Sequence, residues 1–355
     1  MRLRSVAPEA SIVGVALLAS LLTLWNGGKR SVPHEPTEAR ESPSATSTRA
    51  RVRIGLVFDV GGRGDKSFND GAYAGLLRAE KELGAEVAYL EPAGSEDREA
   101  AMRLFAARGM DLILGIGFIF SSDVNAVAKD YPDRKFACVD YAPGPGPMPS
   151  NVQGLVFRDE EGAFLVGAVA GLLTKSNHVG FVGGMQNPLI RKFEAGYEQG
   201  VQETCKECVV HGAYAGATPD AFRDPARGKS LAAAQIAEGA DVLFHASGAT
   251  GHGVFEGARD GRALAIGVDA DQFDEMPGTV VTSMLKRVDV AVFEAIANVL
   301  HGRFRPGMAV FGVREGAIDY VHEGPHAVGL SSSLKERLET LKKAIAQGQI
   351  HVRRE

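Results

Sequence analysis

Polar and aromatic side chains follow the short apolar runs of this sequence. Asp59, Asp140 and Asp269 each come directly after such a run. Phe68 ends the glycine-rich segment that follows Asp59, and Phe193 lies a few residues beyond another run. A carboxylate accepts hydrogen bonds from hydroxyl or ring N–H groups, and its charge makes such a bond about twice as strong. An aromatic face stacks a planar base with about 1–3 kcal/mol. The combination suits a flat, polar, uncharged ligand.

Glycines, hydroxyls and one lysine complete this set of residues at the ends of apolar runs. Glycines there allow backbone N–H groups to approach a ligand closely. The segments in question are 59–70, 117–118, 140–141, 183–185 with Phe193, 247–253, 269–271 and 283–286.

Two glycine-containing segments resemble nucleotide-binding motifs but fail their requirements. Residues 61–67 place Asp65 before Lys66, where a P-loop needs glycine, and a carboxylate there repels phosphate. Residues 251–257 read G-x-G-x-x-x-G, one residue too long for the dinucleotide fingerprint. We expect the loop at 251–253 to lead into a helix and to contact a sugar instead.

The cysteines and histidines do not form a pattern typical of metal binding or catalysis. Cys205 and Cys208 form a lone C-x-x-C, so we expect no zinc; the pair is either an oxidised loop or two free thiols. Cys138 lies in an apolar run and is expected to be a buried thiol. His245 and His252 are expected to be wall or loop residues. We therefore expect no catalytic residue, no metal and no cofactor.

The elements that must position these residues alternate from residue 51 onward. Gly84 is a stop signal for the first helix, and the Pro/Gly segment at 143–147 breaks regular structure. Apolar periodicity predicts strands at 54–58, 87–90, 112–117, 136–139 and 152–157, with helices at 69–83, 100–107 and 122–130.

A second series of the same kind begins at Asp159. It predicts helices at 161–173, 190–203, 230–237 and from Val254, and strands at 179–182, 209–210, 242–244 and 263–268. Such alternation predicts parallel sheets with right-handed crossovers, and therefore an α/β fold of two doubly wound lobes. Ligands bind beyond the carboxyl ends of parallel strands, so the residues at the ends of the apolar runs should converge on one crevice.

We expect the first lobe to span residues 51–157 and the second to span 158–284. The first should be completed by about 285–305, and the second by about 306–352. A length of 355 residues suits two such lobes. The net charge of −5 provides no basic field, so nucleic acid is not an expected partner.

Residues 1–50 are expected to lie outside the fold. Arg2 and Arg4 precede an apolar stretch at 11–25, which is typical of an export signal, so residues 1–25 are expected to be a signal peptide or an uncleaved signal anchor. Residues 26–50 are rich in Pro, Ser, Thr and Glu and are expected to be a flexible linker. The folded part should then be periplasmic or at the cell surface, tethered to the membrane where the segment stays uncleaved.

Four groups of residues carry a resemblance to a known family. They are 59–62 running into 65–70, 183–185 with 193–197, 267–272, and 283–289. On these motifs the chain resembles the basic membrane protein family of ABC transporter substrate-binding proteins, over about residues 51–345. Members of that family are usually lipoproteins, and no cysteine follows the apolar stretch here, so a lipid anchor is not expected.

The resemblance implies a type I periplasmic-binding fold, with two lobes joined by three crossovers. It implies a monomeric, non-enzymatic protein that captures purine nucleosides for an ABC importer made of a permease and an ATPase. By position, it assigns Phe68 and Phe193 to the base faces, Asp140 and Asn69 to the base edge, Asp269 and Lys286 to the ribose hydroxyls with Gly248 nearby, and Asp59 and Ser67 to the wall of the first lobe.

Other functions of such a fold compete with this one. A sensor that feeds a signalling partner has the same sequence features and stays open. A nucleoside-cleaving enzyme would need a metal cluster or a positioned acid–base pair, and the sequence has no Asp-rich metal loop. A gene regulator would need an N-terminal helix-turn-helix, where this chain has an export segment.

Overall fold

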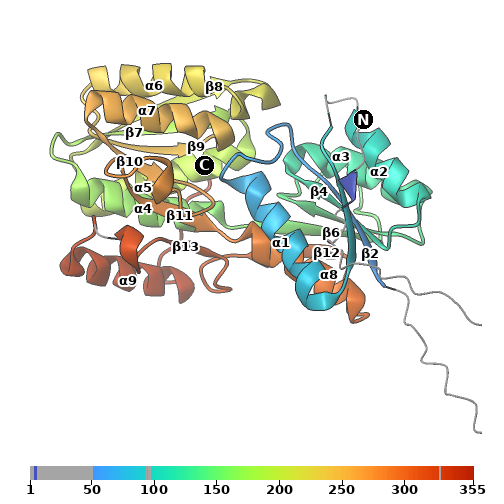
Figure 1. Ribbon diagram of the computed structural model, residues 1–355. Coiled ribbons are helices and arrows are strands. Elements are labelled where there is room, and N and C mark those ends of the chain that lie inside the picture. The colour runs from blue at the N-terminus through green and yellow to red at the C-terminus, as the bar shows by residue number, and fades with distance from the viewer. Residues whose placement is uncertain (1–3, 6–50, 93, 95–96, 328) are drawn as a thin grey trace, which may run out of the picture.

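The structure is a computed structural model that describes residues 4–5, 51–92, 94, 97–327 and 329–355. Apart from residues 4–5, the predicted export segment and linker lie outside the described residues. Two α/β lobes stand side by side, with the first at the right of Figure 1 and the second at the left. None of the described helices is long and apolar enough to span a membrane.

Lobe 1 is built on a sheet of order β1-β3-β2-β4-β5-β6-β12, in which every pair except β1–β3 is parallel. Helices cover both faces of the sheet (Figure 1). The elements are β1 Arg4–Ser5, β2 Arg53–Val57, α1 Phe68–Leu83, β3 Glu86–Leu90, α2 Asp97–Ala107, β4 Leu112–Ile116, η1 Phe118–Phe120, α3 Ser121–Asp130, β5 Lys135–Val139, β6 Val152–Phe157, α8 Val288–Leu300 and β12 Gly307–Phe311.

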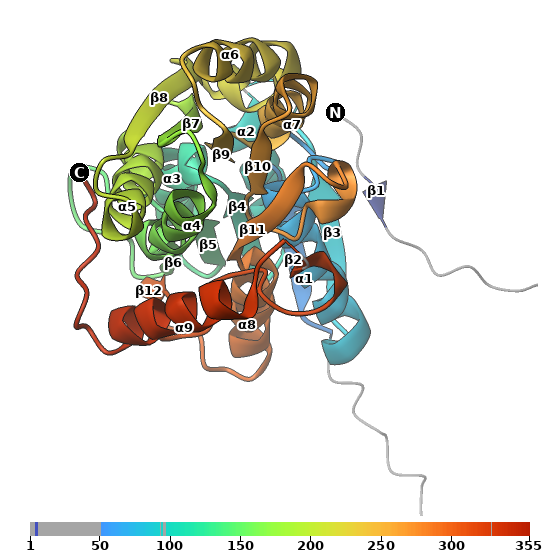
Figure 2. The ribbon, with the colours of Figure 1, turned by 90° about the vertical axis from the view of Figure 1, so that its left-hand side faces the viewer.

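Lobe 2 is built on a sheet of order β13-β11-β10-β9-β7-β8, in which only β13 runs antiparallel to its neighbour. Helix α9 lies beneath α4, as Figure 2 shows from the side of this lobe. The elements are α4 Asp159–Leu173, β7 His178–Met185, α5 Pro188–Thr204, β8 Val209–Gly216, η2 Pro219–Phe222, α6 Pro225–Ala237, β9 Val242–Ala246, η3 Gly248–Thr250, α7 Gly251–Gly261, β10 Leu264–Gly267, η4 Phe273–Glu275, β11 Val280–Lys286, β13 Ile318–Tyr320, η5 Pro325–Ala327 and α9 Ser332–Ala346.

The chain passes between the lobes three times: from β6 to α4, from β11 to α8, and from β12 to β13. This is the expected doubly wound α/β architecture. One boundary differs from the prediction, because residues 306–352 do not all return to lobe 2. Strand β12 pairs along its whole length with β6 of lobe 1, where it extends the sheet edge.

Local signals explain where the helices begin and end. Gly84 ends α1 in the left-handed conformation (φ 68°), as glycine readily does. Asn187 caps α5 by accepting a hydrogen bond from the Ile190 N–H, and Pro188 occupies the first helical position. The predicted strands and helices of both series are present, within a few residues of their expected bounds. Strand β8 is longer than predicted, and the helices and strands after β10, namely β11, α8, β12, β13 and α9, were not predicted.

Candidate functional site

A cavity lies between the lobes, at the carboxyl ends of the parallel strands. The cavity has a volume of about 610 Å³, and part of this volume is open to solvent. This volume lies in the range of sites that bind small molecules. Its lining is Asp59, Gly61, Asp65, Phe68, Asn69, Gly117, Phe118 and Asp140 from lobe 1, and Leu189, Ile190, Phe193, Phe222, Ala246, Ser247, Gly248, Ala249, Val268, Asp269 and Lys286 from lobe 2 and the crossover that follows it. Eight of the nine predicted ligand-binding residues are among them.

Ser67 is the exception. Its hydroxyl donates to Asp269 Oδ2, which lies across the cleft in lobe 2, and its side chain is buried outside the cavity lining. The resemblance assigns Ser67 to the wall of the first lobe, and the structure places its side chain beside the cavity lining instead of in it. The hydroxyl has a partner from the opposite lobe, and the contact joins the two walls.

Lys286, the last residue of β11, is the centre of a buried group of charges. Its Nζ lies 2.8 Å from Asp140 Oδ2 and 2.9 Å from Asp159 Oδ1, and its side chain is 2% exposed. The Lys286 backbone N–H also donates to the Asp269 carbonyl at 2.9 Å. We call Asp140, Asp159, Asp269 and Lys286 the charged corner. Asp159 begins α4 and was not identified from the sequence.

Burial and neighbouring charges shift the pKa values of Lys286, Asp159 and Asp269. Burial lowers the pKa of the Lys286 ammonium, but the surrounding carboxylates outweigh burial and hold that pKa above its usual value. Burial raises the pKa of Asp159 to about 7 and that of Asp269 to about 6, although the Lys286 charge opposes both shifts. Lys286 therefore stays charged, and the carboxyl groups of Asp159 and Asp269 become sensitive to pH near neutrality.

Aromatic rings surround the same ammonium. The Nζ atom of Lys286 lies 5.3 Å from the ring centre of Phe68, 5.6 Å from that of Phe193 and 5.0 Å from that of Phe157. Such distances are those of cation–π contacts. Phe68 and Phe193, the two predicted stacking residues, thus lie at one corner of the cavity.

A second aromatic pair lies farther from the charges. Phe118 of lobe 1 and Phe222 of lobe 2 meet edge to face across the cleft, with ring centres 6.4 Å apart. Both rings line the cavity and are partly exposed. We call this pair the aromatic rim. Phe222 was not identified from the sequence because η2, which carries it, has no apolar periodicity.

The loop between β2 and α1 is organised by Asp65. Its carboxylate accepts hydrogen bonds from the backbone N–H groups of Ser67, Asn69 and Asp70. It thereby occupies the free donors at the start of α1, which in a P-loop would hold phosphate. The Asn69 side chain donates to Asp65 and accepts from the Asp59 N–H at 3.2 Å. The loop is therefore built to present Phe68 and Asn69, not to bind phosphate.

Asp59 lies on the floor of lobe 1. Burial raises its pKa to about 7, against a hydrogen bond from the Val60 N–H. Gly117 has φ 107°, and a Cβ there would come within 2.5 Å of Asp59 Oδ2. Glycine is therefore required beside this carboxylate.

Three residues at the site have left-handed backbones although they carry side chains. They are Lys66 (φ 53°), Asp140 (φ 57°) and Asp269 (φ 66°), and only Asn177 and Arg262 share this feature elsewhere in the described chain. Such conformations are disfavoured and gather at functional sites. The surrounding hydrogen bonds must stabilise these loops.

The histidines lie outside the cavity lining. His245 is fully buried, its Nδ1 lies 3.2 Å from Ser247 Oγ, and burial lowers its pKa to about 3, so it stays neutral. His252 pairs with Glu275 at 3.4 Å. Both agree with the expected wall and loop roles.

The loop at 251–253, which is expected to contact a sugar, follows a short segment that lines the cavity. Gly248 and Ala249 line the cavity, whereas Gly251 and Gly253 do not. A Cβ on Gly251 would collide with the His245 ring at 1.9 Å, and one on Gly253 with the Pro225 carbonyl at 1.7 Å. These two glycines therefore allow α7 to pack closely, and residues 251–253 lie outside the cavity lining.

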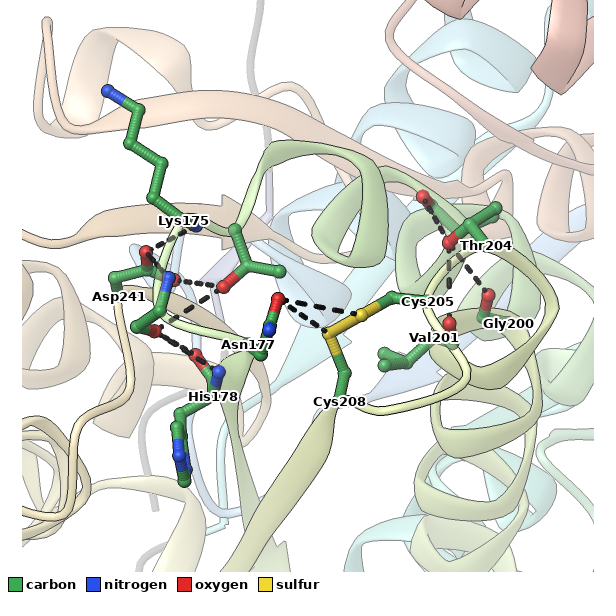
Figure 3. Close-up of a disulfide and its surroundings, with 12 residues drawn as sticks. Lys175, Asn177, His178, Gly200, Val201, Thr204, Cys205, Cys208 and Asp241 are labelled. Atoms are coloured by element: carbon green, nitrogen blue, oxygen red, sulfur yellow. Dashed lines mark hydrogen bonds between the residues drawn. A yellow bond between two sulfur atoms is a disulfide. The ribbon is translucent and has the colours of Figure 1, made fainter.

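Cys205 and Cys208 form a disulfide between the end of α5 and the start of β8, as Figure 3 shows. Both sulfurs lie 3.9 Å from Asn177 Oδ1. Of the two alternatives for this C-x-x-C, the structure has the oxidised loop. Cys138 is a buried free thiol, as expected. Among the described residues, no cluster of three His, Cys, Asp or Glu side chains could hold a metal ion.

Comparisons with known proteins agree with this geometry. Residues 52–354 match the family model described as Bmp, ABC transporter substrate-binding protein PnrA-like. The chain is 34% identical to an uncharacterized lipoprotein of Pyrococcus abyssi, over 90% of this chain and 77% of that protein. It is 32% identical to basic membrane protein A of Borreliella burgdorferi, over 84% of this chain and 87% of the relative.

A solved structure shows the same architecture. The ABC transporter solute-binding protein of Aeropyrum pernix K1 superposes with a TM-score of 0.76 at 31% identity, covering 84% of this chain and 92% of the other.

Proposed function

The chain belongs to the Bmp family of PnrA-like ABC transporter substrate-binding proteins, and from this premise we propose that it captures purine nucleosides outside the cytoplasmic membrane and delivers them to an ABC importer. The observation that carries the proposal is the composition of one cavity. Two aromatic rings, Phe68 and Phe193, line it together with the carboxylate of Asp140, which has an oxygen without a hydrogen-bond partner. A nucleoside offers the matching parts: a planar base and a sugar rich in hydroxyl donors.

A free buried acceptor supports a ligand with hydrogen-bond donors. Asp140 is 6% exposed, and its Oδ1 has no hydrogen-bond partner. A buried polar atom without a partner is costly, so a ligand that donates to it gains affinity. Base N–H groups and ribose hydroxyls are such donors.

The balance of charge supports an uncharged ligand. Asp59, Asp140 and Asp269 line the cavity, and Lys286, the only lysine or arginine in its lining, already contacts Asp140 and Asp159. A phosphate group would meet carboxylates in a poorly hydrated space, where like charges repel strongly. We therefore assign the site to nucleosides, with nucleotides rejected.

Closure of the lobes would complete the capture. The crossovers from β6 to α4 (157–159) and from β11 to α8 (286–288) lie next to the site and are the proposed hinges. Ligand would bind to one wall first, and the second wall would then bury most of its surface. A sensor with the same site would also close in this way, so co-isolation of a permease and an ATPase with the protein tests the transport role separately.

Titration calorimetry tests the ligand class. The protein is unfolded and refolded to remove carried ligand, and is then titrated with adenosine, guanosine, inosine, cytidine, ribose and AMP. We expect submicromolar affinity for purine nucleosides only. Asp269→Ala should weaken that binding by about a hundredfold or more in a protein that still folds, because ribose donors lose their carboxylate partner. Silence across the purine nucleosides would refute the assignment.

A further inference from the structure

Gln272 lies outside the cavity lining but contacts both of its walls. It follows Asp269 on the loop after β10 and is 2% exposed. Its Oε1 accepts a hydrogen bond from the Val268 N–H at 2.8 Å, and its Nε2 donates to the Lys66 carbonyl of lobe 1 at 3.1 Å. One buried side chain thus joins the end of β10 to the loop that leads into α1.

The two segments joined by Gln272 carry important cavity residues. Val268 precedes Asp269, and Lys66 precedes Ser67 and Phe68. Lys66 and Asp269 both have left-handed backbones, which need support from their surroundings. A third bond, from the Gln272 N–H to Ser283 Oγ at 3.0 Å, fixes the position of Gln272 itself.

We propose that Gln272 is a positioning residue that stabilises the closed arrangement of the lobes and so determines how long a ligand stays bound. This inference rests on the proposed capture of ligand between the lobes. The bond to Val268 lies within lobe 2 and survives when the lobes separate. The bond to Lys66 crosses the cleft and must break. Gln272 therefore favours the closed state over the open one.

The location of Gln272 explains why its loss should affect the release of the ligand. A groove of about 960 Å³, open to solvent, lies behind the cavity, and Asp269 and Lys286 line both spaces. Lys66 and Ser67 line the groove on the lobe 1 side. Loss of the contact between Gln272 and Lys66 would loosen this shared wall, and a bound ligand would leave sooner.

Two substitutions separate the bonds of Gln272. Gln272→Glu keeps an acceptor for the Val268 N–H. When its carboxylate is ionised, it cannot donate a hydrogen bond to the Lys66 carbonyl. Gln272→Met has a similar length and removes both bonds in any protonation state. Gln235→Met is the matched control, because Gln235 is also buried (3% exposed) and donates to the carbonyls of Phe181 and His211, both within lobe 2.

The distance between the lobes is the first measurement, and it needs no ligand. Spin labels on Ala107→Cys in α2 and Ala234→Cys in α6, both exposed positions, report that distance in the ligand-free full chain. We expect a closed population in the otherwise wild-type protein, reduced at least fivefold by both Gln272 substitutions and unchanged by Gln235→Met. A chain with no closed population, or variants with the wild-type fraction, would overturn the proposal.

Binding kinetics are the second measurement. With the nucleoside that the titration identifies, the Gln272 variants should dissociate at least tenfold faster, while association changes by less than twofold. A merely structural role would instead lower the melting temperature and leave the dissociation rate unchanged. If no nucleoside binds, the proposed ligand fails, whereas the inter-lobe distances still decide the role of Gln272.

Discussion

The charged corner and the aromatic rim both line one cavity, yet they are held together by different forces. At the corner, Lys286 and its carboxylates are buried, so each charge depends on its partners. At the rim, Phe118 and Phe222 meet only through apolar contact and stay partly exposed. Removing one partner of a buried ion pair is strongly destabilising, whereas apolar contacts tolerate changes of shape. We infer that the corner selects the ligand and that the rim controls its exchange.

The largest effect should follow from removing the cation of the corner. Lys286→Met leaves Asp140 and Asp159 buried without a counter-charge, which should cost about 3–5 kcal/mol of stability. Ligand binding should fall at least a hundredfold, because the carboxylates either take up protons or separate. Chemical denaturation and calorimetry measure the two losses.

A triple variant separates these two effects. Lys286→Met combined with Asp140→Asn and Asp159→Asn removes the cation together with its two ion-pair partners and leaves only Asp269 without its counter-charge, so its stability should return part of the way toward that of the wild type. Its affinity should stay low. Recovery of binding in the triple variant, or wild-type affinity in Lys286→Met, would show that the corner does not select the ligand.

An intermediate effect should come from pH, and it should have opposite signs for ligand affinity and for stability. The pKa of Asp269 is raised to about 6 and that of Asp59 to about 7 by burial. Carboxylates that accept ligand hydrogen bonds must be ionised, so affinity should fall as pH decreases from 8 to 5. Below pH 6 we expect the ligand affinity to fall about tenfold per pH unit if one carboxyl group controls binding.

The stability of the ligand-free protein should increase as pH falls, which is opposite to the change in ligand affinity. Its buried carboxyl groups bind protons more tightly when folded than when unfolded, so these groups stabilise the fold as pH falls from 8 toward 5. Melting temperatures with and without ligand test both signs. Calorimetry near pH 6.5, in buffers of different ionisation enthalpy, should show protons released on binding. Affinity that does not change with pH would contradict ionised carboxylates as the ligand acceptors.

The difference between corner and rim also explains what could be predicted from the sequence. Asp59, Asp140 and Asp269 follow apolar strands directly, so the rule that parallel strands end at one edge was enough to bring them together. Asp159 could not be recognised in this way, because an acidic residue is common in the first turn of a helix. Its role depends on the crossover that places α4 beside Lys286.

Residues that act across the cleft could not be predicted from local pattern. Ser67 and Gln272 have partners about two hundred residues away in the chain, Asp269 and Lys66. Phe222 meets Phe118 only because two separately predicted lobes face each other. Periodicity predicts each lobe, but it contains no information on how two lobes meet. Strand β12 was assigned to the wrong lobe for the same reason.

The smallest effect should follow from Phe222→Ala at the rim. An edge-to-face aromatic pair contributes about 0.5–1.5 kcal/mol beyond the area it buries, which corresponds to a change of about two- to tenfold. Because the pair joins both lobes, its loss should speed dissociation by that factor and leave the ranking of nucleosides unchanged. Stopped-flow displacement measures the rate.

Phe118→Ala and the double variant complete this test. If the rings act together, each single substitution removes the same contact, and the double variant should dissociate no faster than either single one. Phe222→Leu, which keeps apolar volume against Gly184 but has no ring, controls for loss of packing. Additive effects would mean that each ring contacts the ligand separately. A changed ranking of nucleosides in Phe222→Ala would move part of the selection from the corner to the rim.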